Sequence, residues 1–219
     1  MSNYSAEGFN PERIRALKIG METTLGSRIR AAAIFDRDYR SEAECETVRD
    51  QCATFCDQIA IHKRKELENF LLVPPALDRA IERRQSDRFR RTGKKPEQVA
   101  PSAEVLDRFA LERENDVEAQ LIDSRRRFAR SQSSGTHDTS LVKASLAEFK
   151  QRWRNVANRY EMIPGKEALS YLNNYLQDTL GLNITIPAII DAMSSAEVPA
   201  EIQRLIENLA KFGALKPHQ

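Results

Sequence analysis

Two carboxylates one residue apart, Asp36 and Asp38, end an apolar run in the stretch AAAIFDRDYRSE, residues 31–42. In extended backbone, residues i and i+2 point to the same side, and two carboxylates there repel each other unless a cation lies between them. Hard oxygen ligands suit Mg²⁺ or Mn²⁺, and such an ion orients phosphate and activates water. The alternative is that Asp36 ends a strand and Asp38 starts a turn, and the motif alone does not decide between the two.

A second charged stretch is KRKELENFLL, residues 63–72. Glu66 and Glu68 are candidates for a further metal ligand; they face one way if the backbone is extended and diverge if it is helical. The alternative is an ordinary charged helix start, where glutamate favours the positive end of the helix dipole. Three basic residues are candidates to bind phosphate or to hold the acids: Lys63, Arg64 and Lys65.

A third stretch, MIPGKEALSYLNNYL, places Pro164, Gly165 and Lys166 before an amphipathic helix. Backbone N–H groups at such a helix start, together with Lys166, can meet an anion. The spacing is not that of a P-loop, because Gly-x-x-x-x-Gly-Lys-Ser/Thr is absent. The alternative is a turn with a solvated lysine.

The elements that position these residues follow from the pattern of residues 11–62. Helices are expected at 11–25 and from Ser41 to about Cys56, and short buried strands at 28–35 and 57–62. The order helix–strand–helix–strand implies parallel strands with helical crossovers. Ligands of such sheets bind beyond the carboxyl ends of the strands, so Asp36 and the stretch 63–72 should emerge at the same edge.

The rest of the chain reads as helical. Helices are expected at 76–95, 103–130, 141–159, 165–180, 187–193 and 199–211, with mobile breaks at 92–102 and 131–140. We therefore expect an α/β fold followed by an α-helical C-terminal region. The corresponding division is a partial α/β domain at 1–90, a helical insertion with mobile loops at 91–140, and a helical region at 141–219.

Composition sets limits on partners and location. The net charge is only +2, with 34 basic against 32 acidic residues, so attraction for nucleic acid must come from local patches. Two basic runs, 79–95 and 125–130, suit phosphate binding or solvated helix faces paired with nearby acids.

No apolar run is long enough to span a bilayer. The cysteines, Cys45, Cys52 and Cys56, fall on one helix face as a buried structural set, which fits a reducing cytoplasm.

Together the three stretches resemble one family. IFDRDYRSE, HKRKELENFLLVPPAL and PGKEALSYLN are similar, in this order, to the Toprim portion of the OLD-like (overcoming lysogenization defect) nucleases, in which an ABC-type ATPase precedes a Toprim domain. The resemblance covers residues 29–80 well and 160–210 more loosely. It implies a Toprim fold, divalent-metal-dependent cleavage of DNA phosphodiesters, and a role in phage defence.

The resemblance also assigns residues. Asp36 and Asp38 match the family's Asp-x-Asp metal ligands, while Glu66 and Glu68 fall in its downstream acidic motif without a choice between them. Lys166 matches the lysine that such nucleases place near the scissile phosphate. The implied cofactor is Mg²⁺ or Mn²⁺.

The chain departs from the family at its start. A Toprim domain begins with a strand bearing a glutamate, usually followed by glycine, and Glu7-Gly8 is judged an accidental match because a further strand and helix should precede Asp36. No Walker A motif or ABC signature is present. We expect the chain to correspond to the C-terminal part of a longer protein, from a split gene, a truncated product or a gene remnant, with an ATPase-bearing domain or chain as partner and a homo-oligomer as a further possibility.

Three functions follow as hypotheses, and enzymatic activity is left open. The first is the endonuclease module of an OLD-like ATPase. The second is a catalytically incomplete fragment that acts as an interaction or DNA-binding module with an ATPase-bearing partner. The third is a helical nucleic-acid-binding regulator that uses the two basic runs.

Overall fold

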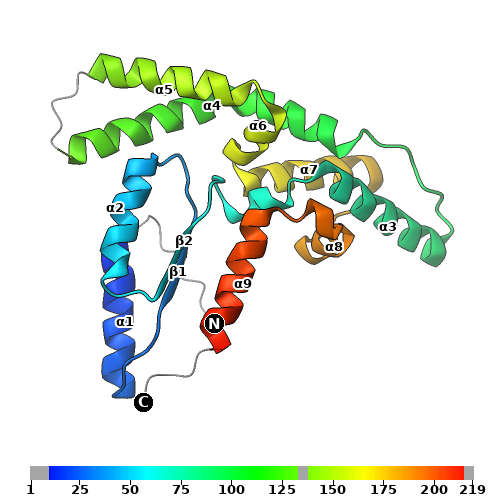
Figure 1. The fold of residues 1–219 in the computed structure, drawn as a ribbon. Helices are drawn as coiled ribbons and strands as arrows, with labels where there is room; N and C mark the ends of the chain where they lie inside the picture. Colours follow the sequence, from blue (N-terminus) through cyan, green and yellow to red (C-terminus); the bar gives the residue numbers. More distant parts are fainter. Residues whose placement is uncertain (1–9, 133–137, 215–219) are drawn as a thin grey trace. The chain divides into compact units, whose positions relative to one another are not determined.

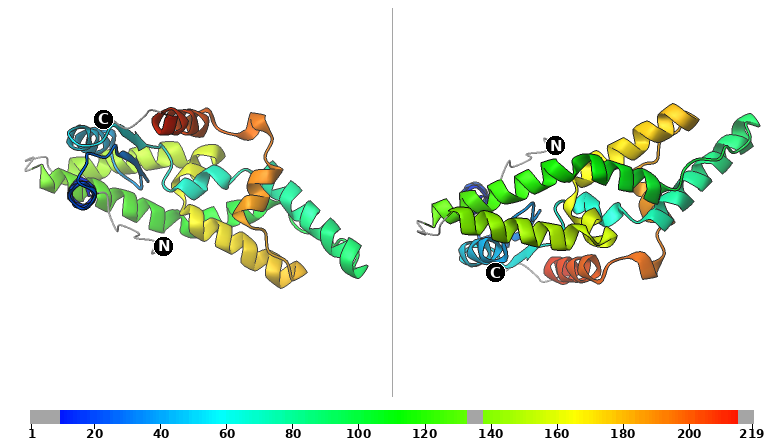
Figure 2. Two further views of the ribbon diagram at one scale, coloured as in Figure 1. Left: turned by 90° about the horizontal axis from the view of Figure 1, so that it is seen from below. Right: turned by 90° about the horizontal axis from the view of Figure 1, so that it is seen from above.

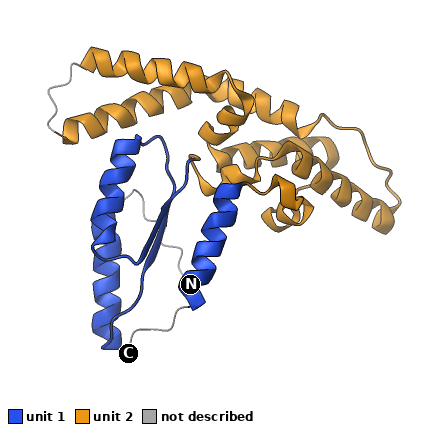
Figure 3. Ribbon diagram, in the orientation of Figure 1, with its two compact units in different colours: residues 1–63, 200–219 blue, residues 64–199 orange. Residues whose placement is uncertain are grey.

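The computed structural model describes residues 10–132 and 138–214. The chain is mostly helical, with one two-stranded parallel sheet. It divides into two compact units, unit 1 with residues 1–63 and 200–219 and unit 2 with residues 64–199 (Figure 3). Each unit is described by itself. Glu7-Gly8 lies outside the described residues. The division of the chain at residues 90 and 140 stays a prediction.

Unit 1 is built around the expected helix–strand–helix–strand order. It contains α1 (Pro11–Leu25), β1 (Ala32–Phe35), α2 (Glu42–Ala53), β2 (Gln58–Ile61) and, from the end of the chain, α9 (Ala200–Ala214). β1 and β2 are parallel, with Ala32 opposite Gln58 and Phe35 opposite Ile61. α2 is the crossover between the two strands and packs against β2 and α1 (Figure 1). The α/β expectation for this part of the chain is confirmed at this level.

The ends of the first helices follow local sequence signals. The Asn10 side chain accepts hydrogen bonds from the N–H groups of Glu12 and Arg13, and Pro11 occupies the first turn of α1. Gly26 ends α1 with a φ of 65°, in the left-handed region that glycine adopts without strain. Ser41 caps α2 by accepting from the N–H of Glu44 at 3.1 Å. Both strands are shorter than expected, with four residues each.

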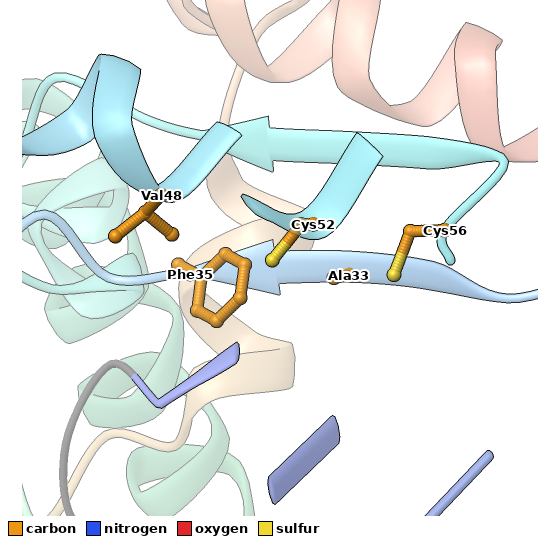
Figure 4. Close-up of a cluster of buried hydrophobic side chains, with 5 residues drawn as sticks. All are labelled: Ala33, Phe35, Val48, Cys52 and Cys56. Atoms are coloured by element: carbon orange, nitrogen blue, oxygen red, sulfur yellow. The ribbon is translucent and has the colours of Figure 1, made fainter. Parts of the chain in front are cut away.

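The core of unit 1 lies between β1 and α2. Alternate residues of β1, Ala33 and Phe35, pack on Val48, Cys52 and Cys56 (Figure 4). The three cysteines are free and buried, as expected for a structural set. The apolar residues of α1 are buried only in part: Ile14 packs against this cluster, while Leu17 and Met21 are exposed.

In the described residues of unit 2, every regular element is a helix. After the 3₁₀ helix η1 (Leu67–Leu71) come α3 (Pro74–Thr92), α4 (Ser102–Ser131), α5 (Asp138–Trp153), α6 (Val156–Met162), α7 (Gly165–Leu180), α8 (Ile186–Ala192) and the 3₁₀ helix η2 (Ser195–Glu197). The long helix α4 packs against α5 on one side and against α7 further along (Figure 2). The buried residues of these three helices include Phe109 of α4, Phe149 of α5 and Leu172 of α7.

Two expectations for unit 2 need correction. The single helix expected at 141–159 is two helices, because the chain breaks after Trp153 and the Asn155 side chain caps α6 by accepting from the N–H of Asn158. The helix expected to reach residue 95 ends at Thr92, because Gly93 adopts a φ of 71°. The segment at 93–101 has no helix, but Glu97 and Ala100 donate their N–H groups to Gln85 and Tyr175.

Candidate functional site

In unit 1 the candidate residues stand at the carboxyl ends of the two parallel strands. Asp36 follows β1 directly and His62 follows β2 directly, so the strand register makes them neighbours. Asp36 Oδ1 lies 3.0 Å from His62 Nε2. The imidazole is buried and the carboxylate is 40% exposed. The expected position of Asp36 at the sheet edge where α/β proteins bind ligands is therefore met.

Asp38 does not continue the extended strand. Its φ of 51° places it in the left-handed region, which aspartate enters more readily than most residues. The backbone turns here, with the N–H of Arg40 donating to the carbonyl of Arg37 at 3.2 Å. The argument that extended backbone turns Asp36 and Asp38 to the same side is therefore wrong, because the strand ends at Phe35 and the turn sets the direction of Asp38.

The Asp38 carboxylate is also engaged by a neighbouring cation. Its Oδ2 lies 2.6 Å from Nη1 of Arg40, whose side chain is only 14% exposed. Arg40 further pairs with Glu44, and Arg37 pairs with Glu42. The turn 36–40 is thus held by arginine–carboxylate pairs, and of the two carboxylates of the motif it is Asp38 that pairs with an arginine.

In unit 2 the structure brings the other two sequence motifs together. The N–H of Lys166, in the first turn of α7, donates to Glu66 Oε2 at 3.0 Å. The ammonium of Lys166 lies 3.9 Å from Glu68 Oε1, and its side chain is 65% exposed. Glu66, Glu68 and Lys166 therefore form one cluster. The helix start that was expected to meet an anion meets the carboxylate of Glu66.

Glu66 and Glu68 differ in their surroundings. Glu66 has extended backbone and precedes η1, while Glu68 lies inside η1. The Glu66 carboxylate also pairs with the ammonium of Lys65 at 2.7 Å, and both side chains are largely buried. Its oxygens thus accept hydrogen bonds from Lys65 and from the α7 backbone, whereas the single ion pair within 4.0 Å that Glu68 forms in the described part of unit 2 is with Lys166.

One residue that the sequence patterns did not indicate holds this cluster in place. Asn69 is fully buried, and its Nδ2 donates to the carbonyls of Tyr160 and Ile163 at 2.7 and 2.8 Å. Its Oδ1 accepts from the N–H of Glu66 at 2.8 Å. The signal that could have identified it is a single amide within the apolar run NFLLV, three residues after an acid.

Gly165 completes the contact between the two motifs. A Cβ atom built on Gly165 would lie 2.8 Å from the backbone nitrogen of Asn69, a separation that real Cβ atoms do not show. The close approach of α7 to η1 therefore depends on the missing side chain at this position.

The carboxylate oxygens of these residues suit a hard divalent cation, but the described residues of neither unit form a complete metal centre. Within residues 10–132 and 138–214, no group of three or more His, Cys, Asp or Glu side chains is placed to hold a metal ion. Asp38 is paired with Arg40, and Glu66 is paired with Lys65 and bonded to the α7 backbone. A metal site involving these residues needs further ligands.

The basic runs are largely engaged within unit 2. On α3, four arginines donate to backbone carbonyls near the ends of α7 and α8: Arg79 to Ala192, Arg83 to Asp191, Arg84 to Asn183 and Arg88 to Leu180. In the second run, Arg125, Arg126 and Arg127 pair with Glu148, Asp138 and Asp123. These contacts support the structural interpretation of both runs.

No protein-family model, curated protein or solved structure matches the chain. The likeness to the OLD-like Toprim domain thus rests on the three motifs alone. In the part of the chain that the structure describes, no helix has the length and apolar character required to cross a membrane.

Proposed function

We propose that this chain is the nuclease module of an OLD-like ATPase, a Toprim-related endonuclease that hydrolyses DNA phosphodiester bonds with Mg²⁺ or Mn²⁺. The observation that carries the proposal is the contact between Asp36 and His62 across the carboxyl ends of two parallel strands. The Asp-x-Asp motif thus begins where α/β sheets bind their ligands, which is what the resemblance requires of it.

The cluster in unit 2 gives separate support to the same proposal. The exposed ammonium of Lys166 is suited to a phosphate group, and its backbone is fixed by Glu66 and by the close approach of Gly165 to Asn69. In unit 1 we assign Asp36 and Asp38 as candidate ligands; in unit 2, taken by itself, Glu68 is a candidate ligand and Lys166 the candidate phosphate contact. Glu66 has a positioning role in this scheme, because its oxygens already hold Lys65 and the start of α7. The further ligands that the metal requires come from an ATPase-bearing partner.

The test is plasmid cleavage by the purified chain, alone and with its ATPase-bearing partner, in Mg²⁺ or Mn²⁺. The double variant Asp36→Ala/Asp38→Ala should lose cleavage while its circular dichroism stays that of the wild type. Asp50→Ala, which removes an exposed carboxylate of α2, is the matched control and should cut normally. Cleavage that persists in the double variant would refute the assignment.

A second candidate function is an interaction or DNA-binding module that does not cut. The observation that favours it is exposed apolar surface in unit 1: four large side chains of α1 and one of β1 are at least 45% exposed, namely Leu17, Ile19, Met21, Leu25 and Ile34. Two strands alone make a weak sheet, and such surface commonly marks a protein interface. A folded chain that copurifies with its ATPase-bearing partner, yet gives no metal-dependent cleavage with it, would establish this alternative.

A further inference from the structure

Unit 2 contains a cavity that neither proposed function uses. It has a volume of about 410 Å³ and lies where α4, α5 and α6 meet, lined by Leu111, Glu114, Lys150, Trp153, Arg154 and Arg159. These three helices contact one another pairwise. Small-molecule sites commonly have volumes of about 300–1,000 Å³, so the cavity has room for a ligand the size of one nucleotide.

The cavity is lined by more positive than negative charge. Three cationic side chains, Lys150, Arg154 and Arg159, face a single carboxylate, Glu114. In the described part of unit 2, Lys150 and Arg154 have no ion pair within 4 Å and no side-chain hydrogen bond, in contrast to the engaged arginines of α3 and α4. Arg159 is anchored and already paired: its Nε donates to the carbonyl of Trp153 at 3.0 Å, and its Nη1 lies 3.8 Å from Oδ1 of Asp107. This arrangement suits an anion that enters from solvent.

The aromatic wall of the cavity carries an unsatisfied donor. Trp153 is 6% exposed, and one face of its indole stacks on Phe149 with a centroid distance of 5.0 Å. Its Nε1 is buried and has no hydrogen-bond partner among the described residues. Buried N–H groups are rarely left unpaired, because a donor removed from water without a new acceptor is destabilising. Trp153 is itself one of the residues that line the cavity.

We propose that the cavity binds a phosphate-bearing ligand of nucleotide size. Lys150, Arg154 and Arg159 bind the phosphate, and an acceptor of the ligand pairs with Nε1 of Trp153. Glu114 limits the net positive charge and offers an acceptor for an amino group. The ligand is either a free nucleotide or one nucleotide of a DNA single strand, since both present the same phosphate chemistry. The inference does not depend on metal binding or cleavage.

The chain provides its own reporter, because Trp153 is its only tryptophan. Tryptophan fluorescence is recorded while thymidine monophosphate, inorganic phosphate or an eight-residue oligothymidylate is added in the presence of EDTA. A saturable change with the monophosphate identifies a free-nucleotide site, and a change with the oligonucleotide alone identifies a single-strand site. No saturable change with any of these ligands overturns the proposal.

Variants locate the binding in the cavity. Lys150→Gln and Arg154→Gln should each weaken binding about fivefold, as expected for the loss of one charge contact of about 1 kcal/mol, and Glu114→Gln should strengthen it. Trp153→Phe keeps the stacking surface but removes the donor, and it should also weaken binding, which is measured for this variant by calorimetry.

The matched control is Arg127→Gln, because Arg127 is 73% exposed and pairs within α4. Equal weakening by Arg127→Gln and Lys150→Gln would show unspecific electrostatic attraction and overturn the proposal.

Discussion

The carboxylate of Glu66 accepts a hydrogen bond from the backbone N–H of Lys166 at 3.0 Å, across one hundred residues of sequence. A carboxylate at the start of a helix satisfies a backbone donor and interacts favourably with the helix dipole. Glu66 thus caps α7, whose own preceding residue, Pro164, forms no side-chain cap. The acidic motif and the lysine motif are parts of one structural unit.

This relationship predicts different roles for the two glutamates. Glu66→Ala should lower the free energy of unfolding by about 1–3 kcal/mol, because it removes a helix cap and a largely buried ion pair with Lys65. Glu68→Ala should change stability by less than about 0.5 kcal/mol, since its ion pair with Lys166 is long and partly exposed. Urea denaturation measures both. A larger loss for Glu68→Ala than for Glu66→Ala would contradict the capping role.

The contact between Gly165 and Asn69 predicts an intolerance to even one methyl group. Gly165→Ala should destabilise unit 2 by about 1–3 kcal/mol, because the new Cβ would meet the backbone of Asn69 and force α7 away from η1. Gly20→Ala is the control: nothing lies within 4 Å of a Cβ at that position in α1, and alanine favours a helix interior by about 1 kcal/mol. Thermal unfolding followed at 222 nm compares the two. A stability of Gly165→Ala equal to the wild type would show that η1 and α7 do not approach as described.

The sequence was informative where structure depends on neighbours in the chain. Pro11, Gly26 and Ser41 mark helix ends through their own backbone preferences or contacts with residues a few positions away, and such signals can be recognised in the sequence alone. The parallel pairing of β1 and β2 also follows from local order, because a helix between two strands leaves few other arrangements. Asp36 was placed at the sheet edge by the same reasoning.

The remaining features depend on contacts between distant segments. The role of Asn69 arises from carbonyls of Tyr160 and Ile163, some ninety residues further along the chain. The left-handed backbone of Asp38 coincides with its pairing to Arg40, which the Asp-x-Asp pattern does not encode. Glu66 and Glu68 are equivalent in the sequence, and it is the packing of α7 on η1 that brings the Lys166 N–H to Glu66 and the Lys166 ammonium to Glu68.

The cysteines of unit 1 provide a test of its core. Burial raises the pKa of the Cys52 thiol to about 11, and burial also raises the pKa of Cys45 and Cys56. At pH 8 only about one Cys52 side chain in a thousand is then the reactive thiolate. We expect no labelling of the three thiols within minutes in the native protein, and labelling of all three in urea, as measured by mass spectrometry after iodoacetamide treatment. Rapid labelling of the native protein would show that the core between β1 and α2 is open.

The ion pair between Arg79 and Glu197 predicts a defined loss of stability in acid. A hydrogen bond from Arg79 and one from the backbone N–H of Ser194 lower the pKa of Glu197 from 4.5 to about 2. A carboxyl whose pKa is lower in the folded state stabilises the fold above its unfolded pKa, and this contribution is lost as the pH falls toward the folded pKa. The melting temperature of Glu197→Gln should therefore lie below that of the wild type at pH 6, and the difference should shrink between pH 4.5 and 2.

Glu82→Gln, at an exposed position of α3, controls for the general effect of charge. If the difference between Glu197→Gln and the wild type stayed constant down to pH 2, Glu197 would not be held as an ion by Arg79. The Arg79 hydrogen bond to the carbonyl of Ala192 would then link α3 to α8 without an ion pair to η2.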